Sequence, residues 1–531
     1  MQPRLWFIFF TLFSLFLLRS DVEAQTADMI LRNGKIFTAD SNRLYVEAIA
    51  IKGNRVLAAG SNEEIDRLAT AKTKRIDLQG RTVIPGLNDA HDHLGWGAHV
   101  GIGFAYTDMN PAGPDKQAVL DSVTRLVKIA KPGQWISGKI GTNVLFDAGM
   151  RAALDSIAPN NPVVLQIWWG HGQVINENAL KLAGLSDRDK DPVGGRYIRV
   201  PANNKIFAIY ENAQVPVWNA WLGSDYATQL KYLRAYSQAR LSVGVTTIQQ
   251  MSSTLSAAQS ARLFKMAKLP QRIRVIAWPG SAPAGRLLGG WNIKSNDPHT
   301  YFSGVKYMMD GTPLEENSLN KKSYHEDGKS YGWLNYPVDT IRAILTEALS
   351  GNQPLMMHIT GDSTMAIILS LMKQLAPNDV WKSKRVRIEH NTTIFITPAE
   401  VNDLKALGLL LMHTPQYNQT SALRSFMDRG IIVGISPDGS GNPFWDIMVV
   451  TSQQSDPSEN ITREQAVIAY TKTNAFAEFK EQEKGMLTRG RLADLTVLSQ
   501  DIFTIPTGQL PATKSVLTMV NGKIVYRDRS F

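Results

Sequence analysis

Short apolar runs alternate with longer amphipathic stretches through the middle of the chain. The stretches 363–375 and 398–407 carry apolar residues at helical spacing, and similar stretches separate most of the runs. The eight strand-like runs are residues 82–87, 243–249, 272–277, 305–309, 354–358, 385–390, 409–412 and 431–435. Repeated strand–helix alternation predicts an α/β fold with a parallel sheet. Eight such units predict a (β/α)8 TIM barrel, with its chemistry at the carboxyl ends of the strands.

Two further regions surround this pattern. The gap between the first two runs is too long for one crossover helix, so residues from about 100 to 241 are predicted to form an inserted subdomain over the barrel mouth. At the chain ends, Asn33-Gly34 and Asn521-Gly522 each lie between short apolar runs, which predicts two β-hairpins. A hairpin alone is marginally stable. The two ends are therefore predicted to form one small composite β-sandwich, from residues 25–82 and 482–531, beside a barrel of residues 83–481.

The amino terminus has the pattern of a secretory signal peptide. Arg4 precedes the apolar run 5–18, and Val22-Glu23-Ala24 places small residues before Gln25. The apolar run is shorter than the roughly 20 residues that a membrane-spanning helix needs. We expect residues 1–24 to be removed, no stable membrane insertion afterwards, and a periplasmic or extracellular protein.

Composition narrows the chemistry. The 531 residues contain no cysteine, which excludes thiolate metal sites and thiol nucleophiles and leaves His, Asp, Glu or a modified Lys as metal ligands. The net charge is +10, but the basic residues are scattered and no nucleic-acid-binding motif accompanies them. We therefore expect a small-molecule substrate as the partner and no nucleic acid. The sequence leaves open whether the protein is a homo-oligomer.

Residues with metal-binding side chains recur at the ends of the predicted strands. His91 and His93 are two residues apart, so on a strand their side chains share a face and both imidazoles can reach one ion. Alone, each such residue is as well explained as part of a packed core. Their recurrence at one end of the barrel favours a metal site instead. The other candidates are Lys306, His358, His390 and Asp438.

These motifs resemble the amidohydrolase superfamily, and within it the amidohydrolase-3 branch of YtcJ-like and N-substituted formamide deformylase-like proteins. The resemblance runs from about residue 31 to residue 526. It is carried by Val83 to His93, Gly170-His171-Gly172 with Asn176, Val305-Lys306 with Asp310-Gly311, His358 with Gly361-Asp362, Arg387 to His390, and Gly485 with Ala493-Asp494. The chain departs from the family where Ser436-Pro437-Asp438 replaces Gly-Ser-Asp and where Ser363 replaces an arginine.

The resemblance implies a divalent metal cofactor, zinc being the first choice. His91 and His93 would hold one ion, His358 and His390 would hold a second, and a carboxylated Lys306 would bridge the two. A single-metal site with unmodified Lys306 is the alternative. Asp438 would contact the metal or its water and act as general acid–base.

Other residues are expected to face the substrate or to support the site. His171, Trp96 and His413 are candidate substrate-binding residues, each with core packing as the alternative. Glu389 is read as a structural residue rather than as a partner of the metal ligands.

The expected function is that of an exported hydrolase acting on a non-peptide carbon–nitrogen bond of a small amide, formamide or cyclic amide. The same centre could instead hydrolyse a lactone or carbamate, deaminate or isomerise. A non-catalytic extracytoplasmic binding protein is the alternative outside enzymes.

Overall fold

The computed structural model describes residues 26–94, 100–108, 110–279, 297–390, 397–416, 422–439 and 441–531. Its centre is an eight-stranded parallel sheet in the order β21-β20-β19-β18-β17-β16-β15-β8. The strands are β8 (Leu87–Asp92), β15 (Val245–Met251), β16 (Arg272–Ala277), β17 (Thr300–Met308), β18 (Leu355–His358), β19 (Arg387–His390), β20 (Leu410–His413) and β21 (Ile432–Ile435). The predicted barrel fold is confirmed.

Side chains join the first and last barrel strands, since β8 and β21 share no ladder among the described residues. The amide of Asn474 donates to the carbonyl oxygens of Asn88 (2.7 Å) and Ile435 (2.9 Å). The backbone N–H of His91 donates to the Ser436 hydroxyl at 2.8 Å. These contacts bring the ends of β8 and β21, and the polar residues on them, to one place.

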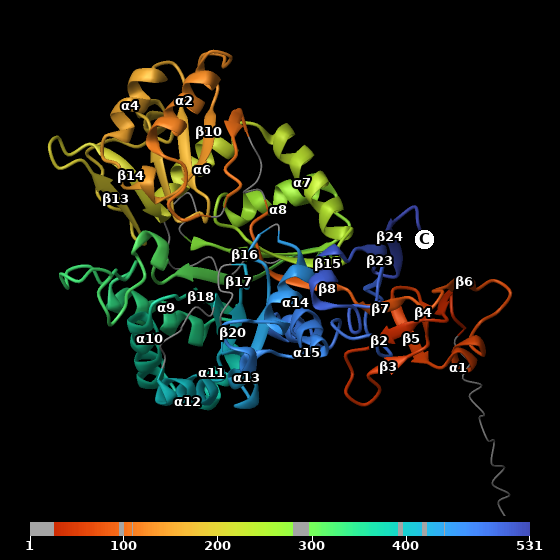
Figure 1. The fold of residues 1–531 in the computed structure, drawn as a ribbon. Helices are drawn as coiled ribbons and strands as arrows, with labels where there is room; N and C mark the ends of the chain where they lie inside the picture. Colours follow the sequence, from red (N-terminus) through yellow and green to blue (C-terminus); the bar gives the residue numbers. More distant parts are fainter. Residues whose placement is uncertain are drawn as a thin grey trace, which may run out of the picture.

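Amphipathic helices cover the outside of the barrel (Figure 1). In α10 (Asp362–Leu375), the buried apolar residues Met365, Ile368, Leu369 and Met372 occupy positions i, i+3, i+4 and i+7, which places them on one face. The other main barrel helices are α7 (Tyr226–Leu241), α8 (Ala257–Ala267), α9 (Val338–Ser350), α11 (Asn378–Lys384), α12 (Pro398–Leu407), α13 (Leu423–Asp428), α14 (Pro443–Thr451) and α15 (Arg463–Ile468). Local sequence also sets helix ends: α12 begins with a capping box between Thr397 and Glu400.

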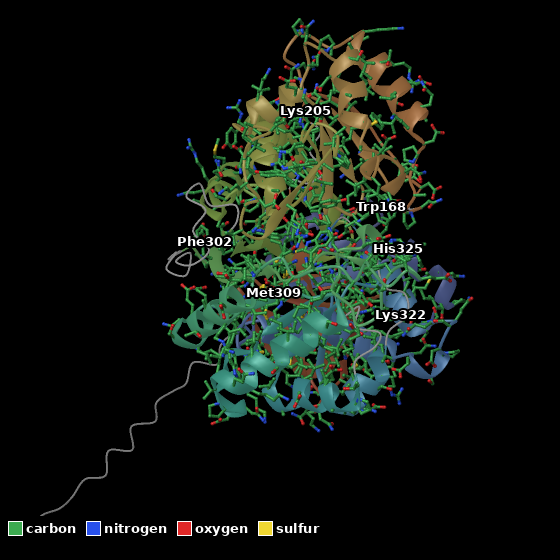
Figure 2. The ribbon with its side chains drawn as sticks, turned by 90° about the vertical axis from the view of Figure 1, so that its left-hand side faces the viewer. Trp168, Lys205, Phe302, Met309, Lys322 and His325 are labelled. Carbon is green, nitrogen blue, oxygen red and sulfur yellow. The ribbon has the colours of Figure 1, made fainter. Side chains whose placement is uncertain are left out.

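A separate sheet lies over one end of the barrel, with α2 (Lys116–Val127) and α4 (Met150–Ile157) on one side and α6 (Val215–Leu222) on the other (Figure 1). Figure 2 shows it from the side, with Lys205 in the upper part and Met309 in the barrel below. The sheet order is β13-β14-β12-β11-β10-β9. Its strands are β9 (Ile102–Phe104), β10 (Ile136–Ile140), β11 (Val163–Ile167), β12 (Gly172–Ile175), β13 (Gly195–Arg199) and β14 (Ile206–Glu211). Helix α7, which falls inside the predicted insertion, packs instead against α8 and β15 of the barrel.

Two further packed sheets are built from the chain ends, the first from amino-terminal strands alone and the second from strands of both ends. One has the order β5-β4-β1-β6, and the other has the order β24-β23-β22-β7-β2-β3. The strands are β1 (Met29–Arg32), β2 (Lys35–Phe37), β3 (Tyr45–Val46), β4 (Ala48–Lys52), β5 (Arg55–Gly60), β6 (Lys74–Asp77), β7 (Thr82–Pro85), β22 (Leu495–Leu498), β23 (Ser515–Val520) and β24 (Lys523–Arg527). One apolar core joins the sheets through residues such as Ile49 and Leu517.

Two local predictions were wrong. The run 82–87 is not the first barrel strand, because β7 pairs with β2 and β22 and the barrel begins only at β8. Asn33-Gly34 does not close a hairpin either, because β1 and β2 enter different sheets. The hairpin at Asn521-Gly522 does form between β23 and β24, with positive φ angles of 57° and 72°.

The predicted signal peptide, residues 1–24, lies outside the described residues, which begin at residue 26. Among the described residues, no helix combines the length and apolar character needed to cross a membrane.

Candidate active site

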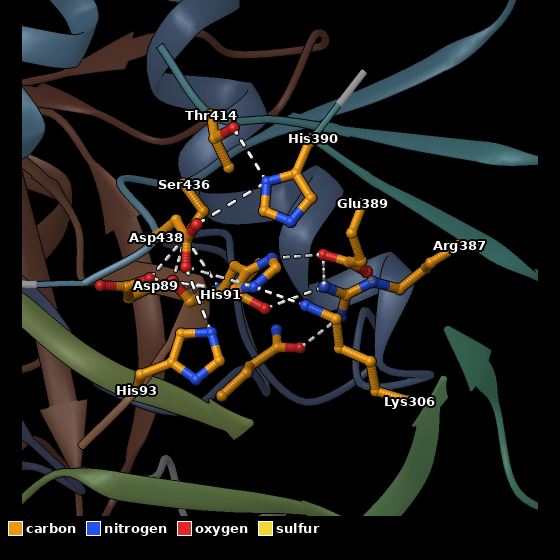
Figure 3. A network of polar contacts seen from close by, with 12 residues as sticks. Asp89, His91, His93, Lys306, Arg387, Glu389, His390, Thr414, Ser436 and Asp438 are labelled. Atoms are coloured by element: carbon orange, nitrogen blue, oxygen red, sulfur yellow. Dashed lines mark hydrogen bonds and ion pairs between the residues drawn. The ribbon is translucent and has the colours of Figure 1, made fainter. Parts of the chain in front are cut away.

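The predicted metal-binding side chains meet at the carboxyl ends of the barrel strands. Figure 3 shows His91, His93, Lys306, His390 and Asp438 of this set. His91 lies in β8, Lys306 in β17, and His358 and His390 end β18 and β19. Asp438 follows β21. All five residues except Asp438 are almost fully buried, and the Asp438 side chain is 12% exposed. The barrel topology therefore places five sequence-distant residues in one small polar cluster.

One half of the cluster consists of His91, His93 and Asp438. The Nε2 atoms of both histidines lie 3.3 Å from Asp438 Oδ1. One potential ligand atom from each residue falls within 4.8 Å of the others, a spacing that a single ion can bridge. Two imidazoles and a carboxylate are a donor set that zinc commonly takes.

Lys306 and the other two histidines complete the cluster. Lys306 Nζ lies 2.9 Å from His91 Nε2. The His390 ring lies between its neighbours, with centroids 4.9 Å from His91 and 4.4 Å from His358. His358 Nδ1 is buried without a hydrogen-bond partner among the described residues. An unpaired buried nitrogen beside other ligand-type side chains fits a position that a metal ion would fill.

Burial keeps these imidazoles neutral. Desolvation, reinforced by Lys306, holds the pKa of His91 well below its ordinary value, and burial also lowers the pKa values of His358 and His390. For Asp438, burial would raise the pKa, but the neighbouring His91, His93 and Lys306 outweigh it and lower the pKa. Neutral imidazoles and an ionised carboxylate are the forms that bind a cation.

The backbone is strained at two of these residues. His390 has a φ of 83° and Asp438 has a φ of 57°, in a region that non-glycine residues rarely adopt. Pro437 fixes its own φ immediately before Asp438. Strain of this kind persists where surrounding contacts hold a functional side chain in place.

Glu389 contacts one of the candidate metal ligands, in addition to the structural ion pair expected for a buried glutamate. Its Oε2 lies 2.7 Å from His91 Nδ1, and its other oxygen accepts from Arg387 Nε at 2.8 Å. A carboxylate on Nδ1 fixes the ring and its tautomer, leaving Nε2 for a metal. Arg387 and Glu389 are two residues apart, so on a strand their side chains share one face. This spacing was the signal in the sequence that could have indicated their pairing. Ser253, 3.0 Å from His93 Nδ1, had no such signal.

We expect Glu389→Gln to weaken metal binding about 10- to 100-fold without unfolding the barrel, because glutamine keeps the shape but loses the charge that orients His91. Competition with a chromogenic chelator measures the affinity. Glu481→Gln is the matched control, since Glu481 forms its own arginine pair with Arg385 at 2.9 Å on another part of the chain. Equal metal affinity in the two variants would contradict the role of Glu389.

The insertion forms the roof of the site. A small cavity of about 20 Å³ lies between the roof and the cluster of candidate metal ligands. Its described lining residues are His93, Trp169, Gly170, His171, Glu211, Gln214, Trp218, Trp278, Lys306, Met308, His358, His390 and Asp438. His171 is thus at the cavity, whereas His413 is buried at the end of β20 and is not among these residues. Trp96 lies outside the described residues.

The pKa of His171, in the insertion, is shifted in the opposite direction from the pKa values of His91, His358 and His390 in the barrel. Burial alone would lower the pKa of His171, but Glu211 and Glu315 reverse the effect and raise it to about 9. Glu211, Glu315 and Gln214 were not recognised from the sequence. Glu211 and Gln214 lie three residues apart at the end of β14 and line the cavity, whereas Glu315 comes from a segment after β17 and approaches His171 from the barrel side.

An eight-stranded parallel barrel that gathers histidines, a lysine and an aspartate at its carboxyl-terminal mouth defines the class of metal-dependent hydrolases. The chain belongs to the Amidohydrolase family, whose Amidohydro_3 profile matches residues 74–526. The resemblance found in the sequence is confirmed.

Individual relatives support this assignment. Protein LONG AFTER FAR-RED 3 of Arabidopsis thaliana is 26% identical and covers 94% of this chain and 92% of its own length. N-substituted formamide deformylase of Arthrobacter pascens is 23% identical, covering 94% of this chain and 99% of its own. The crystal structure of an uncharacterized metal-dependent hydrolase from Pyrococcus horikoshii OT3 superimposes with a TM-score of 0.68 over 90% of this chain and 99% of that chain, at 19% identity. This last likeness shows the shared fold.

Proposed function

We propose that the protein is an exported, zinc-dependent amidohydrolase that cleaves the carbon–nitrogen bond of a small amide, formamide or cyclic amide. The observation that carries the proposal is the position of Asp438, whose Oδ1 lies 3.3 Å from both His91 Nε2 and His93 Nε2 while its side chain lines the cavity. The name of the Arthrobacter relative supports the substrate class, and the signal-peptide pattern of residues 1–24 supports export.

Residues of the cluster have two roles: some would hold metal ions, and Asp438 moves protons. His91 and His93 would hold one zinc ion, and His358 and His390 would hold a second, with Lys306 between them as a carbamate. Bound divalent ions lower the pKa of water and polarise a carbonyl group. Asp438 takes one water proton as the water oxygen bonds to the carbonyl carbon, and delivers that proton to nitrogen as the C–N bond breaks. The products are a carboxylic acid and an amine.

A substrate panel tests the proposal. The mature chain, loaded with zinc, is assayed for product release from N-substituted formamides, anilides, cyclic imides, lactones and aryl carbamates, with purine nucleosides to detect deamination. Turnover is expected for the amide-type substrates and is expected to stop when a chelator is added. Turnover of lactones, carbamates or nucleosides alone would replace the proposed reaction with another one at the same centre.

Carboxylation of Lys306 makes a separate prediction. Burial lowers the pKa of Lys306 to about 8, so the neutral amine is abundant near that pH and declines below it. Only the neutral amine adds carbon dioxide, giving a carbamate and releasing one proton. Loading at about pH 8 with bicarbonate should therefore give two metal ions per chain, and loading at about pH 6 without carbon dioxide should give fewer.

Isotope-labelled bicarbonate provides the direct measurement. The carbamate carbon is expected as a carbon-13 resonance in the metal-loaded protein. Lys306→Ala should lose the resonance, while Lys139→Ala should keep it, although the pKa of Lys139 is also lowered to about 8 by burial. A wild-type protein with two ions and no carbamate resonance would refute the bridging role.

A further inference from the structure

A histidine in the roof faces the metal-ligand cluster. His171 follows β11 in a turn that includes Gly170, whose φ is 94°. The His171 ring centroid lies 4.9 Å from that of His358, and both residues line the cavity with Asp438. Asp438 adjoins His91 and His93, whereas His171 adjoins His358. Two groups that can hold protons therefore lie beside different parts of the cluster.

Carboxylates fix the orientation of His171. Its Nδ1 lies 2.8 Å from Glu211 Oε1, which leaves Nε2 to meet a bound molecule. Glu211 ends β14 with a φ of 54°, so the protein maintains an unfavourable backbone conformation at the residue that holds the imidazole. Glu315 lies close enough for the three side chains to place one polar atom each within 4.8 Å of the others. Glu315 is itself held by the Trp169 indole N–H at 2.7 Å.

A buried amide oxygen in the same roof lacks a partner. The Nε2 atom of Gln214 donates to the carbonyl oxygen of Glu211 at 3.4 Å, which fixes the direction of the amide. Gln214 Oε1 has no hydrogen-bond partner among the described residues, although the side chain is only 1% exposed and lines the cavity. A buried acceptor left unpaired is costly, so this oxygen suits a donor on a bound molecule.

We infer that the roof recognises amides that carry an N–H group, with His171 as a catalytic residue that hydrogen-bonds the substrate carbonyl oxygen and Gln214 Oε1 as the acceptor for the substrate N–H. Glu211 is the positioning residue for His171. This inference rests on the proposed amide hydrolysis and narrows its substrate class to secondary amides, N-substituted formamides and N-unsubstituted lactams or imides. Tertiary amides and esters lack the N–H and leave Gln214 unpaired.

Binding of two small probes tests Gln214 independently of turnover. Calorimetry on the zinc-loaded wild type should show that pyrrolidinone binds about 10-fold more tightly than N-methylpyrrolidinone. The methylated compound has no N–H and leaves the buried Gln214 oxygen unpaired, which costs binding free energy. Gln214→Leu should bind the two with affinities within about twofold of each other, because the acceptor is gone. Equal binding of both probes to the wild type, or an unchanged preference in Gln214→Leu, would overturn this part of the inference.

Kinetics test His171. His171→Asn should lower kcat on a secondary amide about 100-fold with little change in KM, as expected for a donor that strengthens in the transition state. Glu211→Gln should fall between this variant and the wild type, since glutamine can still accept from Nδ1. His325→Asn is the matched control: His325, labelled in Figure 2, also pairs with a glutamate, Glu316 at 2.9 Å. Its side chain, unlike that of His171, is 56% exposed.

The outcomes separate this inference from the proposed function. Absence of amide turnover in the zinc-loaded wild type would overturn the proposed function. Amide turnover that His171→Asn retains at the wild-type kcat would overturn the role of His171 alone. Metal content and thermal unfolding of each variant must match the wild type, and His171→Gln serves as the second variant if His171→Asn does not fold.

Discussion

Replacing Asp438 by asparagine is expected to lower kcat about 1000-fold, because the amide cannot accept and return the proton that hydrolysis moves from water to nitrogen. The side chain keeps its size, and one oxygen remains to face His91 and His93. Metal content is therefore expected to change much less than turnover. Zinc per chain and single-turnover rates on an amide identified by the substrate panel measure the two effects separately.

The control for this variant is Asp428→Asn, which removes a carboxylate that pairs with Arg424 on the surface of α13 and is 62% exposed. It should retain the wild-type kcat. An Asp438→Asn protein with full turnover would remove Asp438 from the acid–base role. Loss of zinc together with turnover would instead assign Asp438 mainly to metal binding, with proton transfer performed by another group.

The barrel could be predicted because its signals are local. Most of the strands contain a short apolar run, and helices such as α10 have apolar residues at helical spacing. Seven of the eight predicted runs coincide with a barrel strand, and the other reaches β8 only at Leu87. The two wrong predictions concern which strands pair with each other, not where the strands lie in the sequence. Residues 82–85 do form a strand, but nothing local shows that it pairs with β22, which follows it by about 400 residues. Asn33-Gly34 has the turn chemistry of a hairpin, yet its two strands join different sheets.

In the candidate site, too, some residues could be predicted from local sequence and others could not. His91, His358 and His390 were recognisable because each lies at the end of a strand, and parallel strands of a barrel must end at one mouth. The roof could not be predicted in this way. His171, Glu211 and Gln214 are brought together by the insertion, where β14 pairs with the non-consecutive strand β12. Their contact depends on long-range packing, which no periodicity in the sequence encodes.

Removing the metal is expected to abolish activity and to lower stability, and the His91→Ala variant should reproduce the effect permanently. His91 is fully buried, its Nδ1 contacts Glu389, and its Nε2 is directed at Lys306 and Asp438. Alanine removes the proposed ligand and leaves Glu389, Lys306 and Asp438 without their common partner. We expect His91→Ala to purify with less than about one-tenth of the wild-type zinc and to lose at least about 1000-fold in kcat/KM.

Chelation of the wild type distinguishes loss of metal from damage to the fold. A ligand that binds only the folded state contributes about 4 kcal/mol at 1000 times its Kd, so the metal-free wild type should unfold at a clearly lower temperature. Added zinc should restore both the melting temperature and the activity of the wild type but neither property of His91→Ala. The exposed His325 supplies the control, since His325→Ala should retain zinc. A His91→Ala protein with normal zinc content would refute His91 as a ligand.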